Sequence, residues 1–251
     1  LDKKRLRDRE RKLHAELEGS YQDLKKAERA RDMLTRMVVH DLNNPLTNIM
    51  GYADLLIGLA ASGPIAEDKL LKYLEIIARA STDMARLTQT ILDTAKLESG
   101  LLNASVAPLD AVSLVAEVCA TFATRAEKAR IHLVYPQEVE PTRVLADRDL
   151  LTRVLQNLLA NALKHPPRGS TVTVSLEREA ATVVLTVADD GPGIPGELQE
   201  QVFDEFFQIE LKNAGVMRGV GLGLTFCKLA TEAQGGKICL ESTPGEGARF
   251  R

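Results

Sequence analysis

The sequence is poor in cysteine and in aromatic residues, and it has no long apolar run. Its cysteines, Cys119, Cys227 and Cys239, are odd in number and lack metal-type spacing, which argues against a zinc site and a disulfide framework. We expect them to be reduced and buried, as in an intracellular protein. No apolar stretch approaches the roughly 20 residues of a membrane helix, and no signal peptide opens the chain. A net charge of −3 favours neither nucleic acid nor a membrane surface as a partner.

The remaining composition is that of an ordinary globular protein, with 45% hydrophobic and 27% charged residues among 251. This length accommodates two compact units with substantial cores. The chain begins at Leu1 instead of a methionine and stops at Arg251 within a strand-like phrase. We therefore expect it to be part of a longer protein.

Residues 1–36 contain no proline and are rich in Arg, Lys, Glu, Leu and Ala. Their seven-residue apolar register predicts a coiled-coil helix that runs without a break into the next segment. A solvated single helix is the alternative. The positions on the apolar seam are Leu6, Leu13, Leu17, Leu24, Ala27, Leu34 and Val38.

Residues 37–100 are predicted to form an all-α helical hairpin. The first helical pattern ends at a turn signal, Gly58 with Gly63 and Pro64, and the second ends at Ser99-Gly100. Two antiparallel helices cannot enclose a core alone, whereas two such hairpins form a four-helix bundle. We therefore predict a homodimer.

Within this hairpin, His40 is followed one helical turn later by Asn44, so both side chains share one face and can address one reacting group. Asp41 lies one step round the helix and is predicted to reach the imidazole only obliquely. Pro45 removes the helical hydrogen bond to the Asp41 carbonyl and predicts a bend. A lone histidine on a helix is usually just packed or solvated. However, a proline inside a helix lowers the stability of the helix by about 3 kcal/mol, so its position beside this histidine suggests a function for the bend.

From residue 106 to residue 251 the pattern changes to short β-like phrases interleaved with helices. This alternation predicts an α+β sandwich with one layer of each. The boundary with the helical hairpin is expected near residues 98–106. The predicted strands are residues 106–109, 131–135, 142–146, 171–177, 182–188 and 237–242, and the predicted helices are residues 110–128, 147–164 and 221–233.

Two stretches of this second unit point to a bound nucleotide. Asn157, Asn161 and Lys164 align on one helical face. Amide oxygens suit Mg²⁺, and a lysine suits phosphate. Asp189 follows a predicted strand and precedes Gly191 and Gly193. A carboxylate there can accept a hydrogen bond from an exocyclic amine, while the glycines allow close approach of a flat ring.

Two further stretches follow in order. Phe203, Phe206 and Phe207 form an aromatic cluster in a chain with six phenylalanines. The stretch 219–223 immediately precedes a helix, so its free backbone N–H groups form an anion site. Residues 208–218 between them are predicted to close as a lid. Alone, each stretch can be explained by a structural role as a turn, as part of the core or as surface. Together, the four stretches indicate a nucleotide site.

The ordered set of His40-Asp41-x-x-Asn44-Pro45, Asn157 to Lys164, Asp189 to Gly193, Phe203 to Phe207 and Gly219 to Gly223 resembles the sensor histidine kinases of two-component systems. The resemblance implies a signalling coiled coil (1–36), a dimerisation and histidine phosphotransfer domain (37–100) and a Bergerat-type ATP-binding domain (106–251). It implies a cytoplasmic fragment, a sensor domain upstream, a homodimer and a response-regulator receiver domain as partner.

The same resemblance implies a role for each matched residue. His40 takes the γ-phosphoryl group of ATP, Asp41 assists it, and Asn44 orients water for dephosphorylation of the receiver. Asn161, assisted by Asn157, binds Mg²⁺. The remaining nucleotide-binding residues are Lys164, His165, Asp189, Gly191, Gly193, Phe207, Gly219, Gly221, Leu222 and Gly223.

The chain departs from the family pattern at two places. His165 and Pro166 replace a common aromatic and hydroxyl pair, and Val220 replaces a common threonine. Two rival interpretations stay open: a clamp-type ATPase of the same superfamily, and a pseudokinase scaffold that binds nucleotide without autophosphorylation. We expect neither His14 nor His132 to be phosphorylated.

Overall fold

The computed structural model describes residues 2–100, 102, 104–136, 140–164, 167, 169–204 and 222–251. The chain divides into two compact units, Leu1–Met84 and Ala85–Arg251. The division falls inside the second helix, so residues 85–98 of that helix make their contacts with the second unit. The sequence analysis did not predict this packing.

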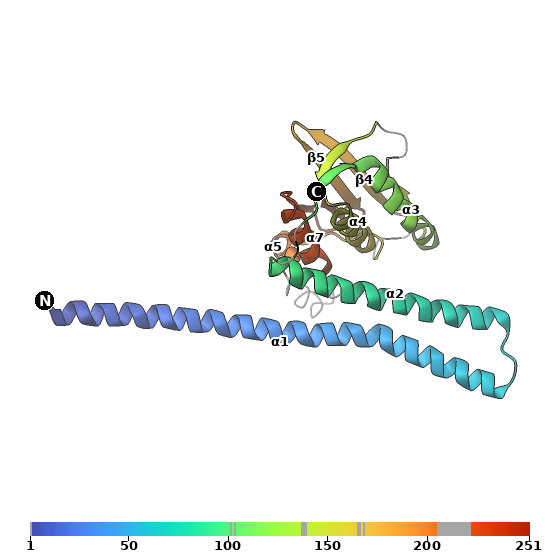
Figure 1. The fold of residues 1–251 in the computed structure, drawn as a ribbon, viewed down its shortest axis with the longest axis horizontal. Helices are drawn as coiled ribbons and strands as arrows, with labels where there is room; N and C mark the ends of the chain where they lie inside the picture. Colours follow the sequence, from blue (N-terminus) through green and yellow to red (C-terminus); the bar gives the residue numbers. More distant parts are fainter. Residues whose placement is uncertain are drawn as a thin grey trace. The chain divides into compact units, whose positions relative to one another are not determined.

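The first unit is built from two helices joined by a short connection (Figure 1). Helix α1 spans Asp2–Ser62 and contains Pro45, and helix α2 spans Glu67–Glu98. The hydroxyl of Thr47 donates to the carbonyl of Asn43 over 2.7 Å, a back-bond that often accompanies a bent helix. Gly100 ends α2 with φ of 66°, as a helix stop signal predicts. The predicted helical hairpin is confirmed.

The hairpin buries little of its own apolar surface. Among the described side chains up to Met84, Ala80 is the one hydrophobic residue classed as buried. Large apolar side chains instead face outward on both helices. They are Leu17, Tyr21, Leu24, Val39, Leu46, Met50, Leu55, Ile57, Leu71 and Leu74.

The second unit contains the predicted sheet. Within the described residues, five strands pair in the order β2-β4-β5-β7-β6, and β1 pairs with β3 in a separate two-stranded sheet. Among the strands that the structure describes, β2 and β4 are the one parallel pair. The strands are β1 (Ala107–Asp110), β2 (His132–Val134), β3 (Arg143–Ala146), β4 (Thr171–Glu179), β5 (Thr182–Asp189), β6 (Leu240–Ser242) and β7 (Ala248–Phe250).

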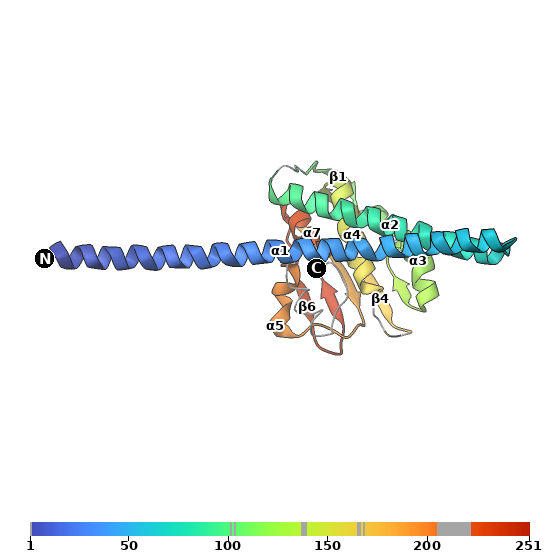
Figure 2. The same cartoon turned by 90° about the horizontal axis from the view of Figure 1, so that it is seen from below.

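Three long helices pack with this sheet as the second layer (Figures 1 and 2). They are α3 (Ala111–Ala129), α4 (Arg148–Ala162) and α7 (Leu222–Glu232). Asp110 and Asp147 cap the first turns of α3 and α4, because each carboxylate accepts a backbone N–H from within the first turn of its helix. A short helix, α5 (Gly196–Gln199), follows β5 and was not predicted. The core includes Leu155, Leu159, Val172, Val187 and Phe226.

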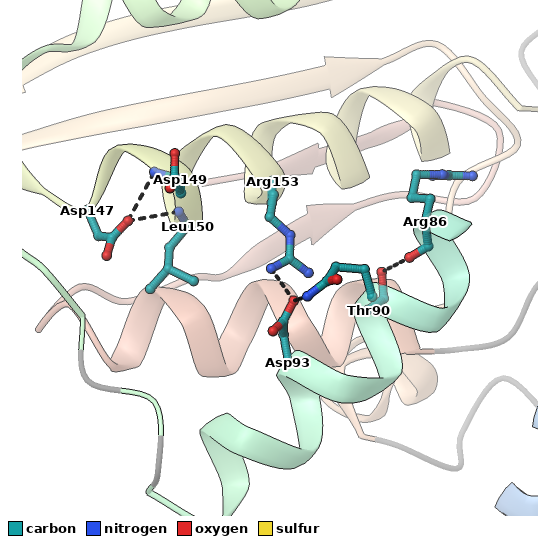
Figure 3. Close-up of polar contacts among 8 residues, drawn as sticks. Arg86, Thr90, Asp93, Asp147, Asp149, Leu150 and Arg153 are labelled. Atoms are coloured by element: carbon teal, nitrogen blue, oxygen red, sulfur yellow. Dashed lines mark hydrogen bonds and ion pairs between the residues drawn. The ribbon is translucent and has the colours of Figure 1, made fainter. Parts of the chain in front are cut away.

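The last turns of α2 are held on the second unit by a largely buried ion pair (Figure 3). Arg153 of α4 contacts the carboxylate of Asp93, whose side chain is 5% exposed. Gln89 donates to the same carboxylate over 2.7 Å. On its other side, the Arg153 guanidinium lies 4.3 Å from the ring centroid of Phe226 in α7. Arg153 therefore links α2 to α4 and α7.

Replacing Asp93 with alanine is expected to lower the free energy of unfolding of the second unit by roughly 1–3 kcal/mol. The change leaves the Arg153 cation without its counter-charge and the Gln89 amide without its acceptor. Denaturation by urea measures the loss. The matched control is Glu117→Ala, which removes an exposed ion pair with Arg148 in the same unit and should cost at most about 1 kcal/mol. Equal losses in both variants would contradict a special role for Asp93.

Candidate active site

His40 lies on α1 with its side chain 55% exposed, and its Nδ1 atom is 2.7 Å from Oδ1 of Asp41. Asp41, which was expected to reach the imidazole only obliquely, is within hydrogen-bond distance of it. The carboxylate reaches the ring directly, because the two neighbouring side chains turn toward each other. The Asp41 side chain is only 13% exposed. When Nδ1–H donates to this carboxylate, the ring lone pair is on Nε2.

Asn44 follows one turn later and is exposed, like His40. Both side chains are therefore accessible to a molecule approaching this part of α1. Pro45, the next residue, lies within the helix as predicted.

On α4, Asn157 and Asn161 are half-buried, and neither amide side chain makes a hydrogen bond to another residue in the described part of the chain. Asn157 faces the first turn of α7: a Cβ placed on Gly223 would lie 3.6 Å from the Asn157 Oδ1 atom. The structure thus brings the predicted amide of Asn157 to the start of the predicted anion-binding helix. Half-buried amides normally have partners, and their oxygens suit Mg²⁺. These residues therefore fit a bound magnesium ion.

Lys164 is exposed just beyond the end of α4. Leu222 is buried at the first position of α7, where it anchors the helix start in the core. The predicted site residues His165, Phe207, Gly219 and Gly221 lie outside the described residues, as does the predicted lid.

Asp189 is half-buried at the end of β5. Its Oδ1 atom accepts the backbone N–H of Gly191 over 2.8 Å. Burial raises the pKa of the Asp189 carboxyl above its ordinary value; the N–H groups of Gly191 and Ala248 act in the opposite direction, and the charge of Asp190 raises it further. A carboxylate partly withdrawn from water in this way makes strong contact with a hydrogen-bond donor when ionised.

Two glycines fix the backbone around Asp189. Gly193 has φ of 70°, and a Cβ there would lie 2.1 Å from the carbonyl oxygen of Thr243. Gly247 has φ of 88°, and a Cβ there would lie 1.8 Å from the carbonyl oxygen of Asp189. Sequence reasoning predicted Gly193 and missed Gly247. The signal was present in the Pro244 to Gly247 stretch, which places turn residues immediately before a strand phrase.

The cysteines do not take part in this site. Cys119 and Cys227 are buried and Cys239 is exposed, so the prediction of three buried cysteines is wrong for Cys239. Burial raises the pKa of Cys119 to about 12 and also raises that of Cys227. Both buried thiols are therefore protonated and unreactive at neutral pH.

Fold and site together define a class of protein. A helical hairpin carries an exposed histidine paired with a carboxylate. An α+β sandwich carries, at one strand end, an Asp with two glycines and, on a neighbouring helix, two amides that have no hydrogen-bond partner among the described residues. This is the organisation of kinases that use a histidine as phosphoacceptor.

Comparison with known proteins identifies the family. Residues 30–100 match the His Kinase A (phospho-acceptor) domain, and residues 146–251 match the Histidine kinase-, DNA gyrase B-, and HSP90-like ATPase. The adaptive-response sensory kinase SasA of Synechocystis sp. is 31% identical over 224 residues, which are 88% of this chain and 58% of SasA. The chain spans 36% to 58% of the length of the curated relatives compared.

Solved structures agree with the sequence relatives. The catalytic domain of histidine kinase ThkA is 31% identical with a TM-score of 0.51, covering 58% of this chain and 92% of that domain. Histidine kinase ThkA in complex with response regulator protein TrrA is 25% identical with a TM-score of 0.60, covering 86% of this chain and 59% of that one. The chain belongs to the sensor histidine kinases and comprises their catalytic portion. Among the helices that the structure describes, none has the length and apolar character for crossing a membrane.

Proposed function

We propose that this chain transfers the γ-phosphoryl group of Mg-ATP to His40 and passes it on to an aspartate of a response-regulator receiver domain. The observation that carries the proposal is the pair formed by the exposed His40 imidazole and the Asp41 carboxylate, 2.7 Å apart. It supplies both features that a phosphoacceptor needs, namely an accessible lone pair and a partner for the remaining ring proton.

In the first step the Nε2 lone pair of His40 attacks the γ-phosphorus. The new N–P bond forms as the bond from that phosphorus to the β,γ-bridging oxygen breaks, and the electron pair leaves with ADP. The ring becomes positively charged, and Asp41 stabilises that charge through the proton on Nδ1. In the second step a receiver carboxylate attacks the same phosphorus, and the N–P electron pair returns to the imidazole.

The second unit holds the nucleotide in this proposal. Asp189 accepts a hydrogen bond from the exocyclic amine of adenine, and Lys164 contacts a phosphate group as a point charge. The amide oxygens of Asn157 and Asn161 hold Mg²⁺, which neutralises charge on the phosphate oxygens when it is bound. Positioning and charge neutralisation supply most of the catalysis in phosphoryl transfer.

The partners in the proposal are a second copy of the chain and a receiver domain. The outward-facing apolar side chains of α1 and α2 would be buried by packing against the hairpin of a second copy, which completes a four-helix bundle. The match of residues 30–100 to the phosphoacceptor domain supports this arrangement. The solved complex of ThkA with TrrA supports a receiver domain as acceptor. Sedimentation of the purified chain measures the oligomeric state.

Incubation of the chain with Mg²⁺ and γ-labelled ATP tests the proposal. Covalent label that is lost in acid and retained in alkali is expected, because a phosphoramidate bond has that stability. ATP labelled in the α-phosphate is the control for trapped nucleotide and should leave no label. A clamp-type ATPase would release phosphate without labelling, and a pseudokinase would bind ATP without either result. Both outcomes contradict the proposal.

Asn44→Ala is expected to spare labelling of the chain and to slow dephosphorylation of the phosphorylated receiver by about tenfold or more. The exposed amide can orient a water molecule but has no part in the attack by Nε2. Release of phosphate from the receiver measures the effect. Asn43→Ala, at the neighbouring exposed amide, is the matched control and should change neither rate. If both rates fell together in Asn44→Ala, its role would be structural.

A further inference from the structure

The loop that follows Asp189 is fastened to the turn between β6 and β7 by two polar side chains. The hydroxyl of Ser242 accepts the backbone N–H of Ile194 over 2.8 Å and donates to the carbonyl of Gly247 over 2.5 Å. The side-chain amide of Gln199 donates to the carbonyls of Ile194, at 2.9 Å, and of Ser242, at 2.6 Å. A backbone hydrogen bond also joins the turn to the loop: the N–H of Gly245 donates to the carbonyl of Pro192 over 2.7 Å.

These hydrogen bonds between the loop after Asp189 and the β6–β7 turn determine where the Asp189 carboxylate points. Asp189 is linked to both segments: its carboxylate accepts the N–H of Gly191 on the loop, and its backbone pairs with that of Ala248 just after the turn. A shift of the loop relative to the turn must therefore disturb one of these contacts. Ser242 and Gln199 are both half-buried, so water competes only partly for their hydrogen bonds. Neither residue was among the predicted site residues.

We propose that Ser242 and Gln199 are positioning residues that hold the Asp189 carboxylate for selection of adenine over guanine. The inference rests on the proposed function of Asp189 as acceptor for the adenine amine. An ionised carboxylate only accepts hydrogen bonds. Adenine presents an amino donor at the ring position where guanine presents a carbonyl oxygen, so a fixed carboxylate favours the first and repels the second.

Discrimination between adenine and guanine requires that the Asp189 carboxylate cannot move away from the bound base. When the loop is loosened, Asp189 loses affinity for the amine, because the bound geometry must be ordered at each binding event. The same freedom relieves the repulsion of guanine. Loss of the fastening should therefore reduce ATP affinity while GTP affinity stays constant or rises. A variant that is merely less stable would have unchanged dissociation constants in its folded fraction.

Calorimetry of ATP and GTP binding to the full chain tests the inference with three substitutions at Ser242 and Gln199 and one control substitution. Ser242→Ala removes the hydroxyl, and Gln199→Glu sets a carboxylate against two carbonyl oxygens. Each is expected to weaken ATP binding by about tenfold without weakening GTP binding. Ser242→Thr keeps a hydroxyl and should restore the ATP affinity. Gln201→Glu, at an exposed glutamine two residues from Gln199, is the matched control and should leave both affinities unchanged.

An unchanged ratio of ATP to GTP affinity in both Ser242→Ala and Gln199→Glu would overturn the inference. If that happened while the unsubstituted chain bound ATP in an Asp189-dependent way, the proposed function would stand and the positioning role alone would fall. If the unsubstituted chain failed to bind ATP, or bound it equally after Asp189→Asn, the assigned role of Asp189 would be wrong and the inference would fall with it. Gln199→Glu keeps the test decisive if Ser242→Ala does not fold.

Discussion

His40→Gln is expected to abolish transfer of phosphate from ATP to the chain. Glutamine keeps a polar side chain at an exposed position, so the helix should be undisturbed. The glutamine amide nitrogen, however, has no nucleophilic lone pair, and the Asp41 carboxylate cannot replace the imidazole as phosphoacceptor. Measured with γ-labelled ATP, the loss should be complete within detection, while ATP affinity by calorimetry stays within about twofold of the unsubstituted chain.

The matched control is His14→Gln, because His14 is also an exposed histidine of α1. Among the described residues His14 has no carboxylate partner, and its substitution should leave labelling unchanged. Label that survived in His40→Gln, or that disappeared in His14→Gln with binding intact, would show that the phosphoacceptor lies elsewhere.

Asp189→Asn is expected to weaken ATP binding by about 10- to 100-fold, the range for loss of a hydrogen bond to a charged group. Asparagine has nearly the same shape, so the change replaces an ionised acceptor with a neutral amide. Calorimetry measures the affinity, and Asp190→Asn is the matched control. The Asp190 carboxylate accepts the backbone N–H of Thr171 over 2.7 Å, and an asparagine oxygen can take over that bond. ATP affinity that is equal in the two variants would contradict the adenine role of Asp189.

The pKa of Asp189 gives this prediction a second readout. Burial raises that pKa, so ATP affinity should fall as the pH is lowered through the raised value, since a protonated carboxyl loses its charge. Stability should change in the opposite direction. The folded state binds the Asp189 proton more tightly than the unfolded state, so this residue makes the protein less stable as the pH rises through its folded pKa. Asp189→Asn should therefore be at least as stable at pH 7 and should lose this pH dependence.

Local signals predicted most of the secondary structure. The spacing of apolar residues predicted α1, α2 and the three long helices of the second unit. Gly100 predicted the end of α2, because glycine readily adopts the left-handed conformation that the structure shows there. The faces of α4 were also predictable, because a spacing of four residues places Asn157 and Asn161 on one side. The proximity of Asn157 to Gly223 is in line with the expectation that one nucleotide contacts both segments.

The remaining features depend on contacts between segments far apart in the sequence. The bonds of Ser242 to Ile194 and of Arg153 to Asp93 join residues 48 and 60 positions apart, and no periodicity reports such pairs. The short distance of 2.7 Å between His40 and Asp41 could not be predicted for a different reason. Helical spacing places two consecutive side chains on diverging directions, and the actual approach depends on their rotamers.

The most direct test of the phosphoacceptor assignment is nuclear magnetic resonance of the labelled chain with ¹⁵N in its histidine rings. After incubation with Mg-ATP, one ring should show coupling between phosphorus and Nε2, and that signal should be missing from His40→Gln. Phosphorus bound to Nδ1 of His40, to another histidine, or to no ring nitrogen in a chain that binds ATP would contradict it.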